Sequence, residues 1–507
     1  MSDKTTATRP LDAHGKPYHR GAMVALLLVA TFAGALNQTT LATAVPTLMK
    51  DFHITMSTAQ QASTWFMLGN GIMIPVSAYL TLKFPTKWLY TTSYALLFIG
   101  TLTIVLTPTS NFSMFIAGRM FQAIAIGVSM PLLQIIFVEI FPPEKRGSAM
   151  GLAGLVFALA PAIGPTFAGW ILNTDHHLFG FTLVASWRSV FFVPLLFIGI
   201  CLVLCPIFIR DVLKNKEVKL DIPSLLLSVV GFGSFLLGFT NVATDGWTSM
   251  TTVLLPISIG IVFIAIFVVK QLHMETPFLD MRVFRIRQFT VATLANSVAT
   301  MAMMGVEMML PIYLQNVRGL SALQSGLTLL PGALMMGLIM PLAGSAYDKI
   351  GAKRLAMVGF LILAIGTLPF MFLNLSAPEH FITTVYGVRM FAVAAVMMPM
   401  MTSAMNALPR EEITHGTASS NTLRQVASAV VVALLSSVTQ NVTNHNMPAQ
   451  SLQEANPIQF AAKSIDAALS GFHVSFALGF SFAILGLIIA LFLRGGKIIN
   501  MDEGGLK

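Results

Sequence analysis

GSAMGLAGLVFALAPAIGPTFAGW, residues 147–170, contains no charged side chain. A helix of this length is about 36 Å long, enough to cross a bilayer. Small residues recur at steps of three or four and therefore share one face: Gly147, Gly151, Gly154, Ala158, Ala162, Pro165 and Gly169. Such a face lets a second helix approach closely, and Pro161 and Pro165 predict a bend near one end. The stretch therefore predicts a kinked, closely packed membrane helix.

Long apolar runs of this kind recur through the whole chain. The 507 residues are 55% hydrophobic and 10% charged, with a mean hydropathy of +0.77, which excludes an ordinary soluble protein. We count fourteen runs long enough to span a bilayer, at about 21–46, 58–82, 88–107, 112–138, 147–172, 187–209, 221–243, 251–270, 289–314, 322–346, 354–375, 381–406, 415–439 and 472–493. Their length and lack of alternation predict helices rather than a barrel. The predicted fold class is an all-α polytopic membrane protein.

The basic residues fall mainly on one side of the predicted membrane. Most of the 30 Lys and Arg residues lie in loops on the side of the N-terminus, whereas Lys50, Arg318 and Lys463 lie on the opposite side. This pattern predicts a multi-pass protein of the cell (plasma) membrane with both termini in the cytoplasm. The net charge of +9 therefore reflects topology and does not indicate a nucleic-acid partner. The first apolar run is too long for a signal peptide, so no cleavage is expected.

One short motif carries a family resemblance. Ala160-Pro161-Ala162-Ile163-Gly164-Pro165, with Gly169 and Trp170 after it, resembles the fifth-helix signature of major facilitator superfamily exporters. The resemblance implies an antiporter whose fifth helix packs against its counterpart in the other half of the protein. It assigns an antiporter motif to Gly154, Pro161, Gly164, Pro165 and Gly169. We expect Gly164 and Pro165 to contact the other half, near the run at 415–439.

The second half of the chain repeats the first. Arg389-Met390-Phe391 matches Arg119-Met120-Phe121, and the segment 341–353 matches 75–87 in the same order. These matches predict two parallel six-helix bundles with the substrate site between them, near the bilayer midplane. The predicted domains are a cytoplasmic tail at 1–20, a bundle at 21–210, a linker at 211–275, a second bundle at 276–495 and a cytoplasmic tail at 496–507. The linker holds two extra transmembrane helices, which are predicted to form a hairpin outside the transport path.

Further motifs resemble the drug:proton antiporter branch with fourteen helices. Arg424-Gln425 and the segment 311–315, PIYLQ, are similar to its lincomycin-resistance-type members most of all. That branch normally has a first-helix aspartate where this chain has Asn37. Because an amide cannot carry a proton, Asn37 and Gln38 are predicted either to contact substrate or to form hydrogen bonds between helices.

Two charged residues within apolar runs are candidates for proton coupling. Arg119 requires buried partners, because an unpaired guanidinium is costly in a membrane, and the resemblance implies a role in proton coupling. Glu307 is costly to ionise there and is our first candidate for the proton carrier; the alternative is a permanently protonated glutamate. Glu139, near the cytoplasmic end of its run, is the second candidate. Arg410 is expected to lie in a solvated loop and to be dispensable.

Further residues are candidates for binding the substrate and for gating the transport path. Methionine adapts its shape to varied partners, and four methionines are predicted to line the substrate site, with plain helix packing as the alternative: Met304, Met308, Met397 and Met401. Asp348 matches the family's loop acid. It is predicted to cap a helix or to pair with Lys349 or Arg354 at the cytoplasmic face, and to act in gating with them.

The sequence thus predicts a secondary exporter of amphipathic or cationic small molecules, driven by inward proton flow through alternating access. No Walker A motif occurs, so ATP-driven transport is not expected, and the chain has no HExxH or GxSxG motif of an enzyme. The expected partners are a drug-like molecule, protons and the lipid bilayer; the protein is expected to be monomeric, without a metal or a cofactor beyond the proton gradient. The alternatives are a dedicated secondary transporter of one metabolite or lipid on the same fold, and a transporter-like sensor or channel.

Overall fold

A computed structural model describes residues 10–178, 181–215 and 221–494 of the chain. Fourteen helices within these ranges are long and apolar enough to cross a membrane, which confirms the predicted number of spans. The predicted C-terminal tail, 496–507, lies outside the described residues, as does the part of the N-terminal tail before residue 10.

The N-terminal bundle is built from six long helices. They are α1 (Arg20–Thr39), α3 (Met56–Lys83), α4 (Thr86–Leu106), α5 (Phe112–Ile140), α6 (Arg146–Asn173) and α7 (Trp187–Phe208). A short helix, α2 (Leu41–Phe52), continues the first span, and the strands β1 (His176–Leu178) and β2 (Phe181–Leu183) form an antiparallel hairpin between α6 and α7.

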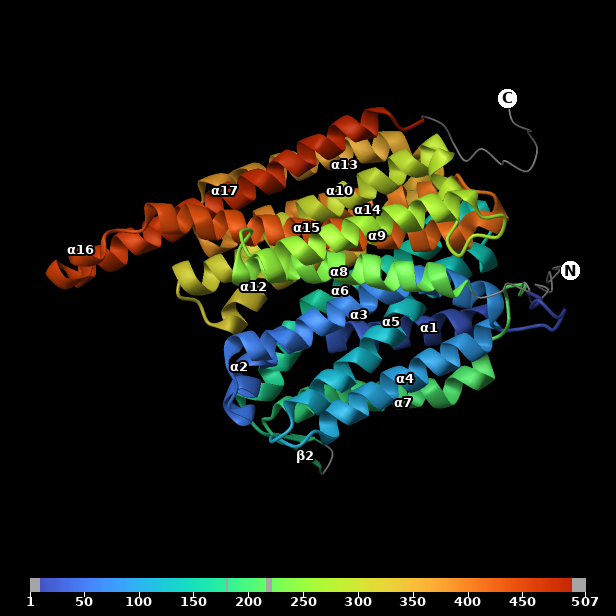
Figure 1. Cartoon of the computed structure of the whole chain (residues 1–507), viewed down its shortest axis with the longest axis horizontal. Helices are drawn as coiled ribbons and strands as arrows, with labels where there is room; N and C mark the ends of the chain where they lie inside the picture. The colour runs from blue at the N-terminus through green and yellow to red at the C-terminus, as the bar shows by residue number, and fades with distance from the viewer. Residues whose placement is uncertain (1–9, 179–180, 216–220, 495–507) are drawn as a thin grey trace, which may run out of the picture.

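The C-terminal bundle repeats this architecture. Its long helices are α10 (Arg287–Glu307), α12 (Ala322–Ile350), α13 (Ala352–Thr367), α14 (Glu379–Asn406), α15 (Ile413–Asn446) and α17 (Pro457–Leu491), with the short helices α11 (Met309–Ile312) and α16 (Gln450–Ala455) between them. Figure 1 shows the α15–α16–α17 hairpin extending beyond the other helices. α15 and α17 are longer than the runs predicted at 415–439 and 472–493, because hydropathy marks only the apolar part of each helix.

The described chain begins and ends on the same side of the molecule, as an even number of spans requires. Figure 1 shows the start of α1 and the end of α17 at one end of the helices. We call this side, which the charge pattern predicts to be cytoplasmic, the inner side, and the opposite side the outer side.

The helices of the two bundles have equivalent neighbours, in agreement with the predicted repeat. α5 packs against α3 and α4, and α14 packs in the same way against α12 and α13. Likewise α1 packs against α6 and α7, and α10 against α15 and α17. The bundles meet through two equivalent pairs, α6 with α12 and α3 with α15. The prediction that α6 meets the run at 415–439 is wrong, because that run is the repeat equivalent of α6 and not its partner.

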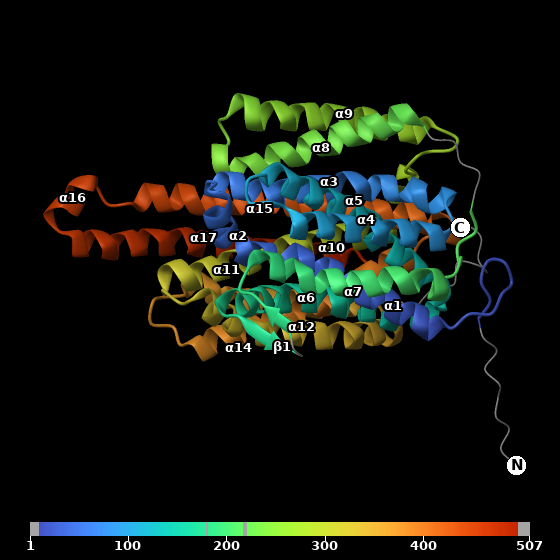
Figure 2. The same cartoon turned by 90° about the horizontal axis from the view of Figure 1, so that it is seen from below.

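The linker forms the hairpin of α8 (Ile222–Asp245) and α9 (Leu255–His273). α8 packs against α3 and α15, one helix from each bundle, and Figure 2 shows α9 outermost on that side. The approach is close: a β-carbon added to Gly71 of α3 would lie 2.2 Å from Cδ1 of Leu236. The hairpin therefore covers the contact between α3 and α15. Its place outside the transport path stays a prediction, as do the domain bounds.

Candidate functional site between the bundles

The inner half of α6 packs directly against α12 of the other bundle. A β-carbon added to Gly147 would lie 2.2 Å from the carbonyl oxygen of Gly344, and one on Gly151 would lie 2.4 Å from Cα of Pro341. A β-carbon on Gly154 would meet methionine sulfur atoms at 2.5 and 2.8 Å. Any larger side chain at these glycines would push the bundles apart. The small-residue face thus makes the predicted close contact between the two halves.

Gly164 does not take part in this contact, and its prediction is wrong. A β-carbon there would lie 2.1 Å from Oγ1 of Thr39, at the end of α1 in the same bundle. Thr39 in turn donates a hydrogen bond to the carbonyl oxygen of Ala160 at 3.0 Å. The reason is helical geometry: at about 100° per residue, Gly164 lies roughly 100° around the helix from Gly147. Gly164 therefore fastens α6 to α1.

The other members of the predicted antiporter motif do not all contact the same bundle. A β-carbon on Gly169 would lie 4.0 Å from the methyl group of Thr43 in α2, also within the N-terminal bundle. Pro161 and Pro165 lie within α6, which continues without a break to Asn173. The side chain of Pro161 lies outside what the structure describes. Only Gly154 of this motif therefore has a described contact with the C-terminal bundle.

The inner ends of the bundles are joined by polar contacts. Arg410, in the 3-10 helix η6 (Arg410–Glu412), forms an ion pair with Glu139 at 2.6 Å. Arg146 Nη1 donates to Asn406 Oδ1 at 3.1 Å. We call these contacts, with those of Ser148 below, the inner seal. Arg410 is 70% exposed, as expected of a loop residue, yet it is not isolated, because it pairs with a residue predicted to carry protons.

Asp348 belongs to the inner seal. It lies near the end of α12 against the first turn of α6, where the Ser148 hydroxyl lies 2.9 Å from Ser345 Oγ and 3.4 Å from Asp348 Oδ2. Lys349 and Arg354 are exposed, and neither has an ion pair or hydrogen bond within the described part of the chain. The predicted pairing of Asp348 with them is wrong. Its position instead agrees with the alternative, an acid at a helix N-terminus, where the helix dipole favours negative charge.

Arg119 lies in a neutral hydrogen-bond network inside the N-terminal bundle. The residue is 1% exposed, and its Nη1 donates to the carbonyl oxygen of Asn37 at 3.0 Å and to Gln122 Oε1 at 2.8 Å. Asn37 is fully buried, and its amide lies 3.5 Å from Thr101 Oγ1. The structure thus shows the alternative of hydrogen bonding between helices for Asn37, while Gln38 is exposed.

Arg389, the equivalent of Arg119, lies in a network that contains an acid. Its Nε donates to Thr367 Oγ1 at 3.1 Å, and its Nη2 donates to the carbonyl oxygen of Met303 at 3.1 Å. Glu307, the last residue of α10, interacts electrostatically with Arg389 and Tyr386. Glu307 Oε2 and Arg389 Nη1 are buried and have no hydrogen-bond partner among the described residues. Two interacting residues of opposite charge type thus each keep a buried polar atom without a hydrogen bond in the described part of the chain.

The predicted methionines pack in the large apolar core of the protein. Met397 and Met401 of α14 are 7% and 6% exposed, and Met304 and Met308 are partly buried against the same core. In this conformation they agree with the alternative of helix packing. The methionine of α14 that reaches the other bundle is Met398, whose sulfur faces Gly154. Met398 follows Met397 and therefore points to another side of the helix, which hydropathy alone does not reveal.

Sequence reasoning also missed a polar contact between the bundles. Asn421 of α15 donates to Gln134 Oε1 of α5 at 2.7 Å, and Arg424 donates to Asn421 Oδ1 at 2.9 Å. The sequence did contain a signal for this contact, namely three polar side chains within apolar runs. We call Gln134, Asn421 and Arg424 the central polar cluster.

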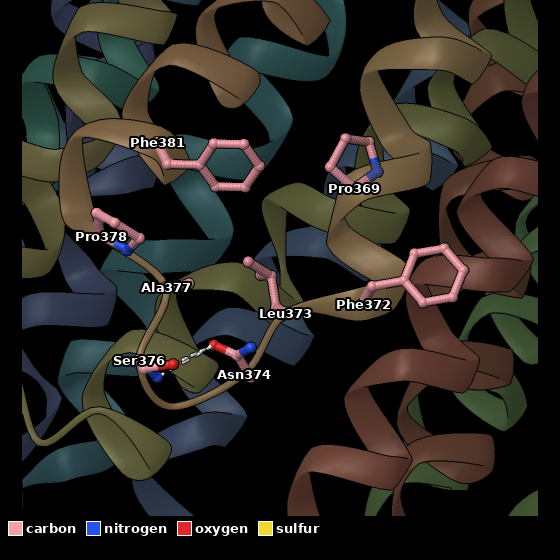
Figure 3. A pocket seen from close by; sticks show the side chains of 8 residues that line it. All are labelled: Pro369, Phe372, Leu373, Asn374, Ser376, Ala377, Pro378 and Phe381. Atoms are coloured by element: carbon pink, nitrogen blue, oxygen red, sulfur yellow. Dashed lines mark hydrogen bonds between the residues drawn. The ribbon is translucent and has the colours of Figure 1, made fainter.

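A hollow on the outer side of the C-terminal bundle differs from the polar contacts between the bundles (Figure 3). It has a volume of about 420 Å³ and is lined by Pro369, Phe372, Leu373, Asn374, Ser376, Ala377, Pro378 and Phe381. Its one hydrogen bond between lining side chains joins Ser376 Oγ to Asn374 Oδ1 at 3.0 Å, within the loop itself. These residues lie in the α13–α14 connection and, for Phe381, in the first turn of α14, all in one bundle, and none is charged. The hollow is therefore a surface feature of that bundle and not the site between the bundles.

Comparison with known proteins agrees with this architecture. The family described as Major Facilitator Superfamily matches residues 27–432. The chain belongs to the Major Facilitator Superfamily. It is 40% identical to the "uncharacterized MFS-type transporter YcnB" of Bacillus subtilis, with 91% of this chain and 96% of that protein covered. It is 34% identical to the "lincomycin resistance protein LmrB" of the same species, with 93% and 95% covered. The predicted lincomycin-resistance-type resemblance is confirmed.

A solved structure supports the fold alone. The proton:xylose symporter XylE has a TM-score of 0.59 to this chain at 15% identity, with 96% of this chain and 99% of that chain covered. Family and relatives identify this superfamily member as a multi-pass membrane transporter and not an enzyme.

Proposed function

We propose that this transporter exports amphipathic small molecules from the cell in exchange for protons, by alternating access between its two bundles. Support comes from relatives named for lincomycin resistance and from the interface of α6 and α12. The proposal places the protein in the plasma membrane with the inner side in the cytoplasm, and it requires no cofactor beyond the proton gradient. In alternating access the inner seal must break so that substrate can enter from that side.

The observation that carries the proton-coupling proposal is the arrangement of Glu307 and Arg389. Arg389 is fully buried and Glu307 is partly buried, and each has a buried polar atom without a hydrogen-bond partner in the described part of the chain. A protonated Glu307 is neutral and can stay unpaired at modest cost, whereas an ionised Glu307 in a membrane interior needs a cation. Loss of the proton would therefore draw Glu307 of α10 and Arg389 of α14 together. A proton would in this way shift two helices of the C-terminal bundle relative to each other.

The test is substrate-driven proton movement in proteoliposomes that contain wild type or Glu307→Gln at equal incorporation. Lincomycin, ethidium and tetramethylrhodamine are the probes, and a pH-sensitive dye reports internal pH. Glu379→Gln is the matched control, because Glu379 is an exposed acid in the first turn of α14. We expect at least one probe to move protons with wild type and the control, and none with Glu307→Gln.

Two results would contradict the proposal in different ways. A wild type that moves no protons with any probe would argue against drug:proton exchange and favour a dedicated transporter of one metabolite or lipid. Unchanged coupling in Glu307→Gln would place the proton site elsewhere, and Glu139→Gln would then be the next variant to measure.

A further inference from the structure

The central polar cluster lies deep between the bundles. Arg424 follows the start of α15 by eleven positions, which places it roughly 16 Å along the helix and thus near the middle of a hydrocarbon core of about 30 Å. Gln134 comes from α5 of the N-terminal bundle, and Asn421 and Arg424 come from α15 of the C-terminal bundle. A ligand at this cluster would therefore contact both moving parts of the protein.

Arg424 has no acidic partner among the residues that the structure describes. The ion pairs found among the described residues involve His14, Lys270 and Arg410 instead. Its only hydrogen bond within the described part of the chain is to Asn421. A cation at this depth is costly, so an arginine kept there without a counter-charge marks a pathway for substrate or ions.

The cluster has an excess of hydrogen-bond donors. Asn421 Nδ2 is fully used, because it donates to Gln134 Oε1 and to the carbonyl oxygen of Thr417, the latter at 2.9 Å. Gln134 is 1% exposed, yet its Nε2 has no partner among the described residues. A guanidinium has five N–H donors, and Arg424 uses one of them here. A partly buried positive charge with unused donors, beside a buried unpaired amide of the opposite bundle, is suited to a negatively charged acceptor.

We propose that the central polar cluster binds an anionic group, such as a carboxylate, on the transported amphipathic molecule. The inference rests on the proposed function and narrows its substrate class from amphipathic molecules in general to those that bear an anionic group, zwitterions included. Arg424 supplies the charge and Gln134 supplies amide hydrogens from the opposite bundle. Glu307 belongs to α10 and is not part of the cluster, so the anion site and the proposed proton site are made of different residues.

The test uses two probes that differ in one carboxylate. Tetramethylrhodamine carries a free carboxylate, which its methyl ester lacks, and fluorescence anisotropy reports binding of each to the purified full-length protein. We expect wild type to bind the carboxylate probe about tenfold or more tightly than the ester. Arg424→Gln should abolish this preference, and Arg424→Lys should keep part of it. Gln134→Glu should reverse the preference, because it places a carboxylate of the protein beside Arg424.

Arg188→Gln is the matched control, because Arg188 is an arginine at the outer end of α7 whose Nη2 donates to the carbonyl oxygen of Thr107. It should keep the wild-type preference. A purely structural Arg424 would change the affinity for both probes alike, and that result, or equal affinities in wild type, overturns the inference. Different results would contradict the proposal of proton exchange and the proposal of an anion site. Arg424-dependent binding without proton movement would contradict only proton exchange, whereas ethidium-driven proton movement with equal rhodamine affinities would contradict only the anion site.

Discussion

The two bundles bury equivalent arginines in different surroundings. Arg119 of α5 donates only to neutral acceptors, among them Gln122 and the backbone of Asn37. Arg389 of α14 likewise donates to a threonine and to backbone carbonyls, but it also interacts electrostatically with Glu307. The same residue at the same place in the repeat thus completes a neutral network in one bundle and interacts with an ionisable acid in the other.

This difference indicates which bundle can respond to a proton. A neutral network of amides and carbonyls keeps one charge state at every accessible pH, whereas an acid beside an arginine has two. We therefore expect mutations to distinguish a structural arginine, Arg119, from a coupling arginine, Arg389. This expectation departs from the proton-coupling role that family resemblance implies for Arg119.

The largest effect is expected from Arg389→Met. Without Arg389, an ionised Glu307 loses the cation with which it interacts, so the acid should stay protonated and substrate-driven proton movement should fall to background. Proteoliposomes with an internal pH dye measure this proton movement. The matched control is Arg188→Met, at the outer end of α7, where the helix begins. Normal proton movement by folded Arg389→Met protein would remove the proposed distinction between the two bundles.

Arg119→Met should instead act mainly on stability. The carbonyl of Asn37 and the amide of Gln122 would lose a buried donor, at a cost of about 1–3 kcal/mol. We expect a lower midpoint of thermal unfolding in detergent and an unchanged number of protons moved per substrate by the folded fraction. If proton coupling fails in folded Arg119→Met protein, the N-terminal network also couples protons.

The exposed ion pair of the inner seal should have a smaller effect. Glu139→Gln or Arg410→Ala should lower stability by up to about 1 kcal/mol, because Arg410 is 70% exposed and water and salt screen the pair. The loss should shrink at high ionic strength. The double exchange Glu139→Arg with Arg410→Glu should recover most of the loss. A complete loss of proton movement in Glu139→Gln would show that this acid is more than a surface partner.

The smallest effect concerns the linker, where Asp221 precedes α8 and forms an ion pair with Lys270 of α9. Burial alone would raise the pKa of Asp221. The hydrogen bonds from Lys270 and Ser224 together lower this pKa by a larger amount, so the net shift is downward. A carboxyl whose folded-state pKa is lowered stabilises the fold above its unfolded pKa, and this contribution is lost as the pH falls through the folded value. Asp221→Asn should thus lower the thermal midpoint slightly at neutral pH and not at all in strong acid. An effect independent of pH would contradict this origin.

Sequence alone was sufficient for features that depend on local composition. Length and hydropathy gave all fourteen spans, because the bilayer sets a minimum apolar length for each helix independently of its neighbours. The repeated Arg-Met-Phe segments indicated two bundles, and the cost of burying charge in lipid singled out Arg119 and Glu307.

Which surfaces meet was decided only by the tertiary structure. The stripe of small residues predicts close packing but does not name its partner, and α6 meets α12 at Gly147 and α1 at Gly164. Arg410 is separated by 271 positions from Glu139, and Asn421 by 287 from Gln134, so no local pattern could pair them. Hydropathy records how long each helix is, whereas its rotation and neighbours arise from the fit of complete helix surfaces against one another. The central polar cluster exists only because that fit brings α5 and α15 together.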